Sequence, residues 1–118
     1  MVGDGPLRSQ LQQLAAEQLK RHTIEFVGVD ANPAPHIAAA DAMVLPSLFE
    51  GMPNVVLEAM ALGTPVIATR AGGTIELMDQ EPTMLLADPG EPLSLASAIR
   101  EFVSDRDAAC RGGSALRP

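Results

Sequence analysis

The 118-residue chain contains no tryptophan and no tyrosine, and its only aromatic residues are three phenylalanines. Basic residues are also few, with 8 Lys and Arg against 15 Asp and Glu, which gives a formal net charge of −7 at pH 7. Because it has neither a basic stripe for phosphates nor aromatic rings for stacking on bases, the chain does not fit a nucleic-acid-binding protein. The same deficit of positive charge argues against binding to an anionic membrane surface.

Cysteine and histidine are scarce as well. The single Cys110 excludes an internal disulfide framework, and with only two histidines an ordinary structural zinc site is excluded too. No apolar run approaches the roughly 18 residues that a membrane-spanning helix needs. The first residues, from Met1 to Gly5, do not resemble a signal peptide. Since 47% of the residues are hydrophobic, we expect a small, soluble, acidic, cytoplasmic protein with a packed core.

Short apolar runs alternate along the chain with longer segments of helical periodicity. The predicted strands cover residues 24–28, 42–46, 65–69 and 84–87, and the predicted helices cover 6–20, 35–40, 53–62, 74–78 and 92–103. Continuously apolar strands are typical of a sheet that is buried on both faces. This order predicts an α/β fold, a doubly wound parallel sheet with helices on both faces. We expect one partial domain over residues 1–104 and an irregular tail over 105–118.

The most informative segment runs from Pro46 to Met60, from the end of one predicted strand into an apolar helix. In open α/β sheets, ligands bind at the edge where the strands end. Pro53 suits the start of this helix and Gly63 its end. The sequence therefore predicts a ligand site at the beginning of the helix.

Backbone groups at this helix start suit an anion. Unpaired N–H groups near Met52, Asn54 and Val55 would attract a diphosphate. Gly51 allows the backbone to approach a ligand closely.

Two glutamates flank this turn. Glu58 is the only charged residue between positions 51 and 69, and in so apolar a helix a carboxylate is costly unless it is paired or functional. It lies about 7–8 Å along the helix axis from Pro53, where it could accept two hydrogen bonds from a vicinal diol such as a ribose. Glu50, in the preceding loop, could accept hydrogen bonds from the hydroxyls of a sugar. The alternative is that glutamates near a helix start merely stabilise its dipole.

The segment Glu50-Gly51-Met52-Pro53-Asn54-Val55-Val56-Leu57-Glu58 closely resembles the E-x7-E motif of retaining glycosyltransferases of family 4. Three further segments are similar to the same family, in matching order over residues 2–104: Val2-Gly3-Asp4-Gly5-Pro6-Leu7, Phe26-Val27-Gly28 and Ala71-Gly72-Gly73-Thr74-Ile75-Glu76. Members have the GT-B fold, two Rossmann-like domains that face a cleft. The resemblance implies that this chain is part of the C-terminal domain, which binds the nucleotide-sugar donor.

The resemblance also implies a role for each matched residue. Glu58 would hold the ribose hydroxyls of the donor, and Glu50 would contact the donor sugar and act in catalysis. The remaining matched residues would bind the diphosphate or the sugar through Gly51, Met52, Pro53 and Asn54, and would border the nucleotide base through Val27 and Gly28. Transfer would retain the anomeric configuration and would need no metal or other cofactor beyond the donor substrate.

The chain departs from the family pattern at its beginning. The basic pair that grips the diphosphate in relatives would lie before Val2, and so would the N-terminal, acceptor-binding domain. We therefore expect a truncated piece of a hexosyltransferase-type enzyme that is inactive by itself. The alternative is a stand-alone, non-catalytic half-domain that binds a partner or forms a homo-oligomer through an exposed sheet edge. A nucleotide-sugar epimerase is disfavoured by the E-x7-E motif.

Other residues that could carry chemistry are given structural roles. His22 and His36 are expected at the surface or at helix ends. Arg70, which follows a predicted strand, is expected to be solvated or to cap a helix. No Ser-His-Asp set and no nucleophile elbow is present around Ser47.

Overall fold

The computed structural model describes residues 1–49, 51, 53–78 and 84–112 of the chain. The chain divides into two compact units, Met1–Pro33 and Ala34–Pro118, and each unit is described by itself. In the described part of the chain, no helix combines the length and the apolar character needed to cross a membrane.

The first unit holds helix α1 (Arg8–Gln18), inside the range predicted for a helix. The strand expected over residues 24–28 is wrong as a regular strand, because Gly28 forms only isolated bridges with Val2 and Gly3. The segment that could pair with it leads within a few residues into the turn at Pro6 and Leu7, so no ladder develops. Gly28 has a φ of 82°, a left-handed conformation that does not continue a strand.

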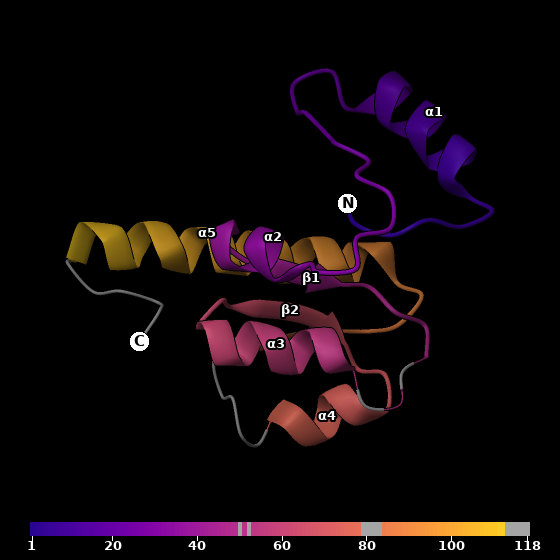
Figure 1. Ribbon diagram of the computed structural model, residues 1–118. Helices are drawn as coiled ribbons and strands as arrows, with labels where there is room; N and C mark the ends of the chain where they lie inside the picture. Colours follow the sequence, from indigo (N-terminus) through magenta and orange to yellow (C-terminus); the bar gives the residue numbers. More distant parts are fainter. Residues whose placement is uncertain (50, 52, 79–83, 113–118) are drawn as a thin grey trace. The chain divides into compact units, whose positions relative to one another are not determined.

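The second unit is built around a parallel sheet (Figure 1). Its strands are β1 (Met43–Leu45), β2 (Val66–Thr69) and β3 (Leu85–Ala87), in the order β1-β2-β3. Met43 is in register with Val66, and Ile67 with Leu85. The helices are α2 (Ala34–Ala39), α3 (Asn54–Leu62), α4 (Gly73–Met78) and α5 (Pro92–Gly112). The expected α/β class with a parallel sheet and helices is confirmed.

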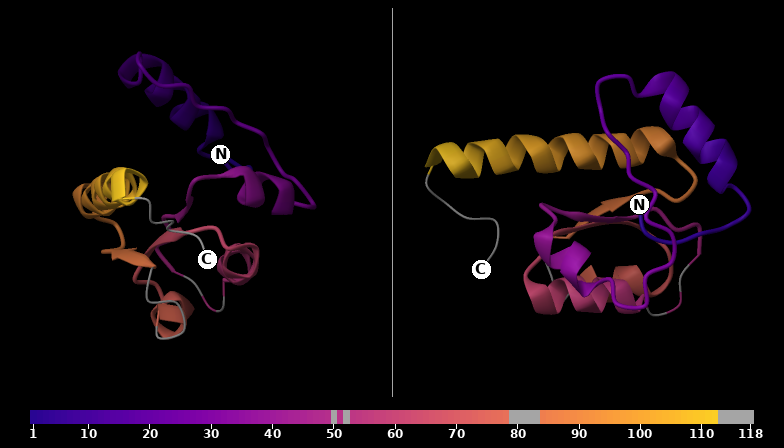
Figure 2. Two further views of the ribbon diagram at one scale, coloured as in Figure 1. Left: turned by 90° about the vertical axis from the view of Figure 1, so that its left-hand side faces the viewer. Right: turned by 45° about the horizontal axis from the view of Figure 1, so that its top comes forward.

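Helices cover both faces of the sheet (Figure 2). Val66 and Ala68 of β2 belong to one core cluster, which also contains residues of α2, α3 and α4, among them Ile37 and Val56. Ile67, between them, belongs to a second cluster, which contains Ala98 of α5. This division follows from the pleat, because successive side chains of a strand point to opposite faces. All four residues of β2 are buried, as expected for a central parallel strand.

Helix α5 continues to Gly112, so the irregular tail expected from residue 105 is wrong up to that point. The Arg106 guanidinium forms an ion pair of 2.7 Å with Asp41, which lies just before β1. This long-range contact ties the helix to the unit beyond its predicted end. The apolar face of α5 is also narrower than the apolar residues within 92–103 suggest. Leu95, Ala98 and Phe102 pack against the sheet, whereas Leu93 is 79% exposed.

Candidate functional site

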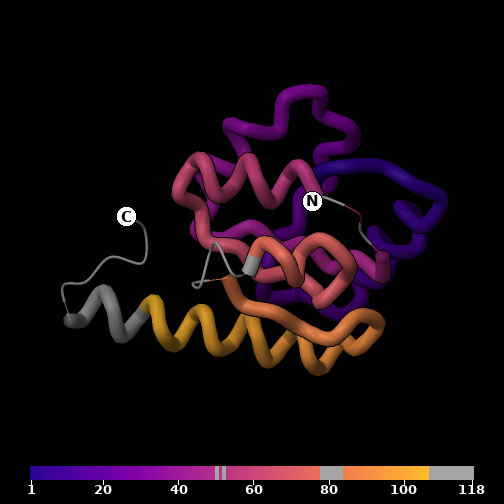
Figure 3. The backbone as a smooth tube through the Cα atoms, turned by 90° about the horizontal axis from the view of Figure 1, so that it is seen from below, coloured from indigo at the N-terminus to yellow at the C-terminus, as the bar shows by residue number. Residues whose placement is uncertain are grey.

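The candidate site lies at the edge where the three parallel strands end. Each strand there leads through a loop into a helix, residues 46–53 into α3, 70–72 into α4 and 88–91 into α5. The chain can be followed from α3 through β2 to α4 in Figure 3. All of these loops meet at one edge because the strands are parallel. This is the edge at which open α/β sheets bind ligands.

The start of α3 presents free backbone donors at this edge. Pro53 precedes the helix with φ −78° and ψ 102°, and no side chain caps the first turn. The N–H groups of Val56 and Leu57 donate to the Pro53 carbonyl at 3.0 and 3.4 Å. Among the residues that the structure describes, the N–H groups of Asn54 and Val55 therefore have no partner. Such groups carry the positive end of the helix dipole and suit an anion.

Glu58 lies four residues after Asn54, on the same exposed face of α3. The opposite face is buried through Val56 and Ala59. The expectation that an apolar surrounding would make this carboxylate costly is wrong, because the side chain is exposed. Within the described ranges Glu58 makes no hydrogen bond or ion pair. A ligand could therefore use both of its carboxylate oxygens without breaking an internal contact.

The loop before α3 is held by the neighbouring segment. The carbonyl of Gly51 accepts a hydrogen bond of 2.8 Å from the N–H of Gly73, the first residue of α4. A Cβ atom placed on Gly51 would meet no heavy atom of the described residues within 4 Å, so none of these residues requires a glycine there. The predicted roles of Glu50 and Met52 lie outside the described residues.

Arg70 is the one basic residue in the three loops, which also contain Glu50, Asp88 and Glu91. Its side chain is half exposed, as expected for a solvated arginine, and its guanidinium donates to the Asp88 carboxylate at 2.7 Å. Both side chains are at least half exposed, so the pair contributes at most about 1 kcal/mol to stability. The loops are thus net acidic, and their attraction for an anion comes mainly from the start of α3.

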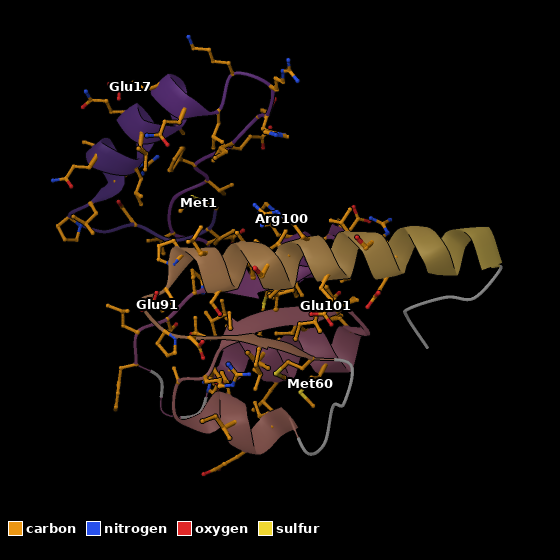
Figure 4. All side chains as sticks on the ribbon, turned by 180° about the vertical axis from the view of Figure 1, so that it is seen from behind. Met1, Glu17, Met60, Glu91, Arg100 and Glu101 are labelled. Carbon is orange, nitrogen blue, oxygen red and sulfur yellow. The ribbon has the colours of Figure 1, made fainter. Side chains whose placement is uncertain are left out.

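The remaining residues of interest are the two that were predicted to border the nucleotide base and several exposed side chains. Val27 and Gly28 lie in the first unit, Met1–Pro33, and their role beside the nucleotide base stays a prediction. Near the carboxyl edge, Leu48 and Phe49 are 76% and 86% exposed. Figure 4 shows Glu91 beside the beginning of α5.

The sequence matches the model of a protein family described as "Glycosyl transferases group 1" over residues 1–105. Two curated relatives are similar over most of the chain. It is 39% identical to the lipopolysaccharide core biosynthesis glycosyltransferase LpsD of Rhizobium meliloti, with 97% of this chain and 34% of the relative covered. It is 40% identical to the putative teichuronic acid biosynthesis glycosyltransferase TuaC of Bacillus subtilis, with 86% and 24% covered. The chain thus spans about a third of the length of LpsD and about a quarter of that of TuaC.

Solved structures share the fold. Anabaena Alr3699/HepE in complex with UDP-glucose is 31% identical, with a TM-score of 0.78, and the match covers 90% of this chain and 31% of that one. Sucrose-phosphate synthase from Thermosynechococcus elongatus is 34% identical, with a TM-score of 0.75, and the match covers 88% and 28%.

Proposed function

The chain belongs to the glycosyl transferases group 1 family, and on this basis we propose that it is the donor-binding part of a retaining, family-4 glycosyltransferase with the GT-B fold. In this proposal the chain is a piece of the C-terminal domain. The longer protein moves a hexosyl group from a nucleoside-diphosphate sugar to an acceptor and keeps the anomeric configuration. The acceptor site lies in an N-terminal domain, in keeping with the small share of the relatives that this chain spans.

The start of α3 is the observation that carries the proposal. Asn54 and Val55 offer free N–H groups to a diphosphate, and Glu58 offers a free carboxylate about 6 Å further along the helix axis, at a rise of 1.5 Å per residue. We assign the ribose hydroxyls to Glu58, because a carboxylate with two free oxygens can accept both hydrogens of a vicinal diol. A similar structure holds UDP-glucose, which contains both groups.

The remaining roles extend this assignment to the neighbouring residues. Gly51, Met52 and Pro53 line the approach of the diphosphate and the donor sugar, and Glu50 contacts that sugar and acts in catalysis. Val27 and Gly28 border the nucleotide base. The dipole of α3 stabilises the negative charge that develops on the leaving diphosphate.

We propose that the 118-residue chain does not transfer a sugar by itself. Its three loops at the carboxyl edge contain one basic residue, Arg70, which is engaged with Asp88. A departing diphosphate carries more negative charge than this pair and one helix dipole can neutralise. The further cations and the acceptor site would come from other parts of a longer protein.

A titration of the isotopically labelled chain with UDP-glucose, followed by nuclear magnetic resonance, tests the proposal. We expect binding with a Kd in the millimolar range, with amide shifts concentrated at residues 51–58. Shifts confined to other segments, or none at millimolar donor, would contradict the donor site. Incubation of the pure chain with UDP-glucose should leave the donor intact, and turnover would contradict the proposed inactivity.

A second candidate is a stand-alone module that associates through its sheet edge. Among the described residues, β1 pairs only with β2, and Val44 in β1 is 41% exposed. An open edge strand of this kind can pair with another chain. Light scattering after gel filtration would support this candidate if the chain is a dimer that Val44→Lys dissociates. A monomer at high concentration would exclude it.

A further inference from the structure

Two threonines in the segment from β2 to α4 bury their hydroxyl groups. Thr69 is 3% exposed and Thr74, in the first turn of α4, is fully buried. A buried hydroxyl without a partner is unfavourable, and both hydroxyls have partners outside their own element. The Thr69 hydroxyl donates to the carbonyl of Ser47, in the loop that follows β1. The Thr74 hydroxyl donates to the carbonyl of Thr69 at 2.6 Å.

The Thr74 hydroxyl also accepts a hydrogen bond of 3.1 Å from the N–H of Ala71. One side chain therefore closes the turn between β2 and α4 and anchors the backbone of Thr69. Because the rest of β2 is buried in the sheet, Thr69 is a fixed point from which its hydroxyl reaches the neighbouring loop. Thr74 holds Thr69, and Thr69 in turn holds Ser47.

The loop before α3 is consequently fastened at two places. The Ser47 carbonyl is bound by Thr69, and the Gly51 carbonyl is bound by the N–H of Gly73 at 2.8 Å. Both fastening groups belong to the continuous segment from β2 to α4. Ser47 and Gly51 both precede α3 in the sequence, and the free N–H groups lie in the first turn of that helix.

We propose that Thr69 is a positioning residue of the donor site, and this inference rests on the function proposed above. Its hydroxyl holds Ser47, which follows β1, in place before the donor binds. A loop that is already ordered loses less conformational freedom on binding, which strengthens binding without a direct contact. Thr69 itself touches no ligand.

Substitutions of Thr69 distinguish the role of its hydroxyl from the role of the rest of its side chain. Thr69→Val keeps the branched shape and removes the hydrogen bond from the Thr69 hydroxyl to the Ser47 carbonyl. Thr69→Ser keeps the hydroxyl. Thr64→Val is the matched control, because Thr64 is also 3% exposed and donates from the segment between α3 and β2 to the Ile37 carbonyl at 2.9 Å. Both valine variants lose one hydrogen bond from a threonine hydroxyl to a backbone carbonyl, but only Thr69 lies at the donor edge.

Amide hydrogen exchange and a UDP titration, both followed by nuclear magnetic resonance, give the test. We expect Thr69→Val to speed exchange at Gly73, whose N–H binds Gly51, and to raise the Kd for UDP by about tenfold. Thr69→Ser should stay within about twofold of the unmodified chain on both measures, and Thr64→Val should do the same even if its unfolding midpoint falls.

Unchanged exchange at Gly73 and an unchanged Kd in folded Thr69→Val would overturn the inference. Equal changes in Thr64→Val would also overturn it, because they would show a general loss of stability. If Thr69→Val does not fold, Thr69→Cys takes its place, since a thiol is a weak donor of similar size. If UDP shifts no residue of the unmodified chain, the donor site itself is wrong, whereas the exchange data still report separately whether Thr69 holds the loop.

Discussion

Replacing Glu58 separates a ligand-binding residue from a structural one. The side chain is exposed and has no hydrogen-bond or ion-pair partner in the described part of the chain. Glu58→Ala should therefore change the free energy of unfolding by no more than about 0.5 kcal/mol. Alanine is also a good helix former, so the local cost to α3 is small.

The effect on donor binding should be much larger. A carboxylate that accepts hydrogen bonds from both ribose hydroxyls contributes on the order of 1–3 kcal/mol, because its bonds are charge-assisted. This corresponds to a rise in the Kd for UDP-glucose of roughly fivefold to over a hundredfold. Chemical denaturation measures the change in the free energy of unfolding. The titration followed by nuclear magnetic resonance measures the Kd for UDP-glucose.

A matched control uses another exposed helical glutamate. Glu101 lies along α5 (Figure 4), away from the start of α3. Glu101→Ala should leave both the stability and the Kd close to those of the unmodified chain. If Glu58→Ala binds UDP-glucose as tightly as Glu101→Ala does, the assignment of the ribose to Glu58 is refuted. A large loss of stability in Glu58→Ala would instead indicate a structural role.

Three further substitutions test the packing that supports the site. Ile67→Ala should lower the free energy of unfolding by about 2–5 kcal/mol in a denaturation experiment, because Ile67 is 1% exposed in the second core cluster; a loss below about 1 kcal/mol would contradict that packing. Gly63→Ala should cost about 1–2 kcal/mol, because Gly63 ends α3 with a φ of 72°, and no loss would argue against this helix end. Arg106→Ala should cost at most about 1 kcal/mol, and less in high salt, because its pair with Asp41 is largely exposed; a salt-independent loss would contradict an ionic origin.

Local sequence features were sufficient for most of the second unit. Proline at position 53 and glycine at position 63 bracket α3 within one residue of the prediction, because both act through their own backbone conformations. The apolar runs around Val44, Ile67 and Leu86 became the three parallel strands. A continuously hydrophobic run predicts such a strand well, because a strand that is buried on both faces has apolar side chains on both of its sides.

Features that depend on distant partners could not be read from local patterns. The run at residues 24–28 has the composition of a strand, but a strand needs a ladder, and this segment has only isolated bridges. The pair between Asp41 and Arg106 joins residues far apart in the sequence, and α5 extends beyond the end that its periodicity suggested.

At the candidate site, too, the features that depend on distant partners could not be predicted from local patterns. The position of Glu58 on the helix was predicted, but its exposure depends on which face of α3 the sheet covers. Thr69 was missed because its hydroxyl binds a carbonyl 22 residues away. A threonine at the end of a strand is too common to suggest such a bond by itself.

A crystal structure of the chain with UDP-glucose bound would show which residues hold the donor. We expect the diphosphate against the N–H groups of Asn54 and Val55, and the ribose hydroxyls within hydrogen-bond distance of the Glu58 carboxylate. A nucleotide bound elsewhere, with Glu58 facing only solvent, would contradict this expectation.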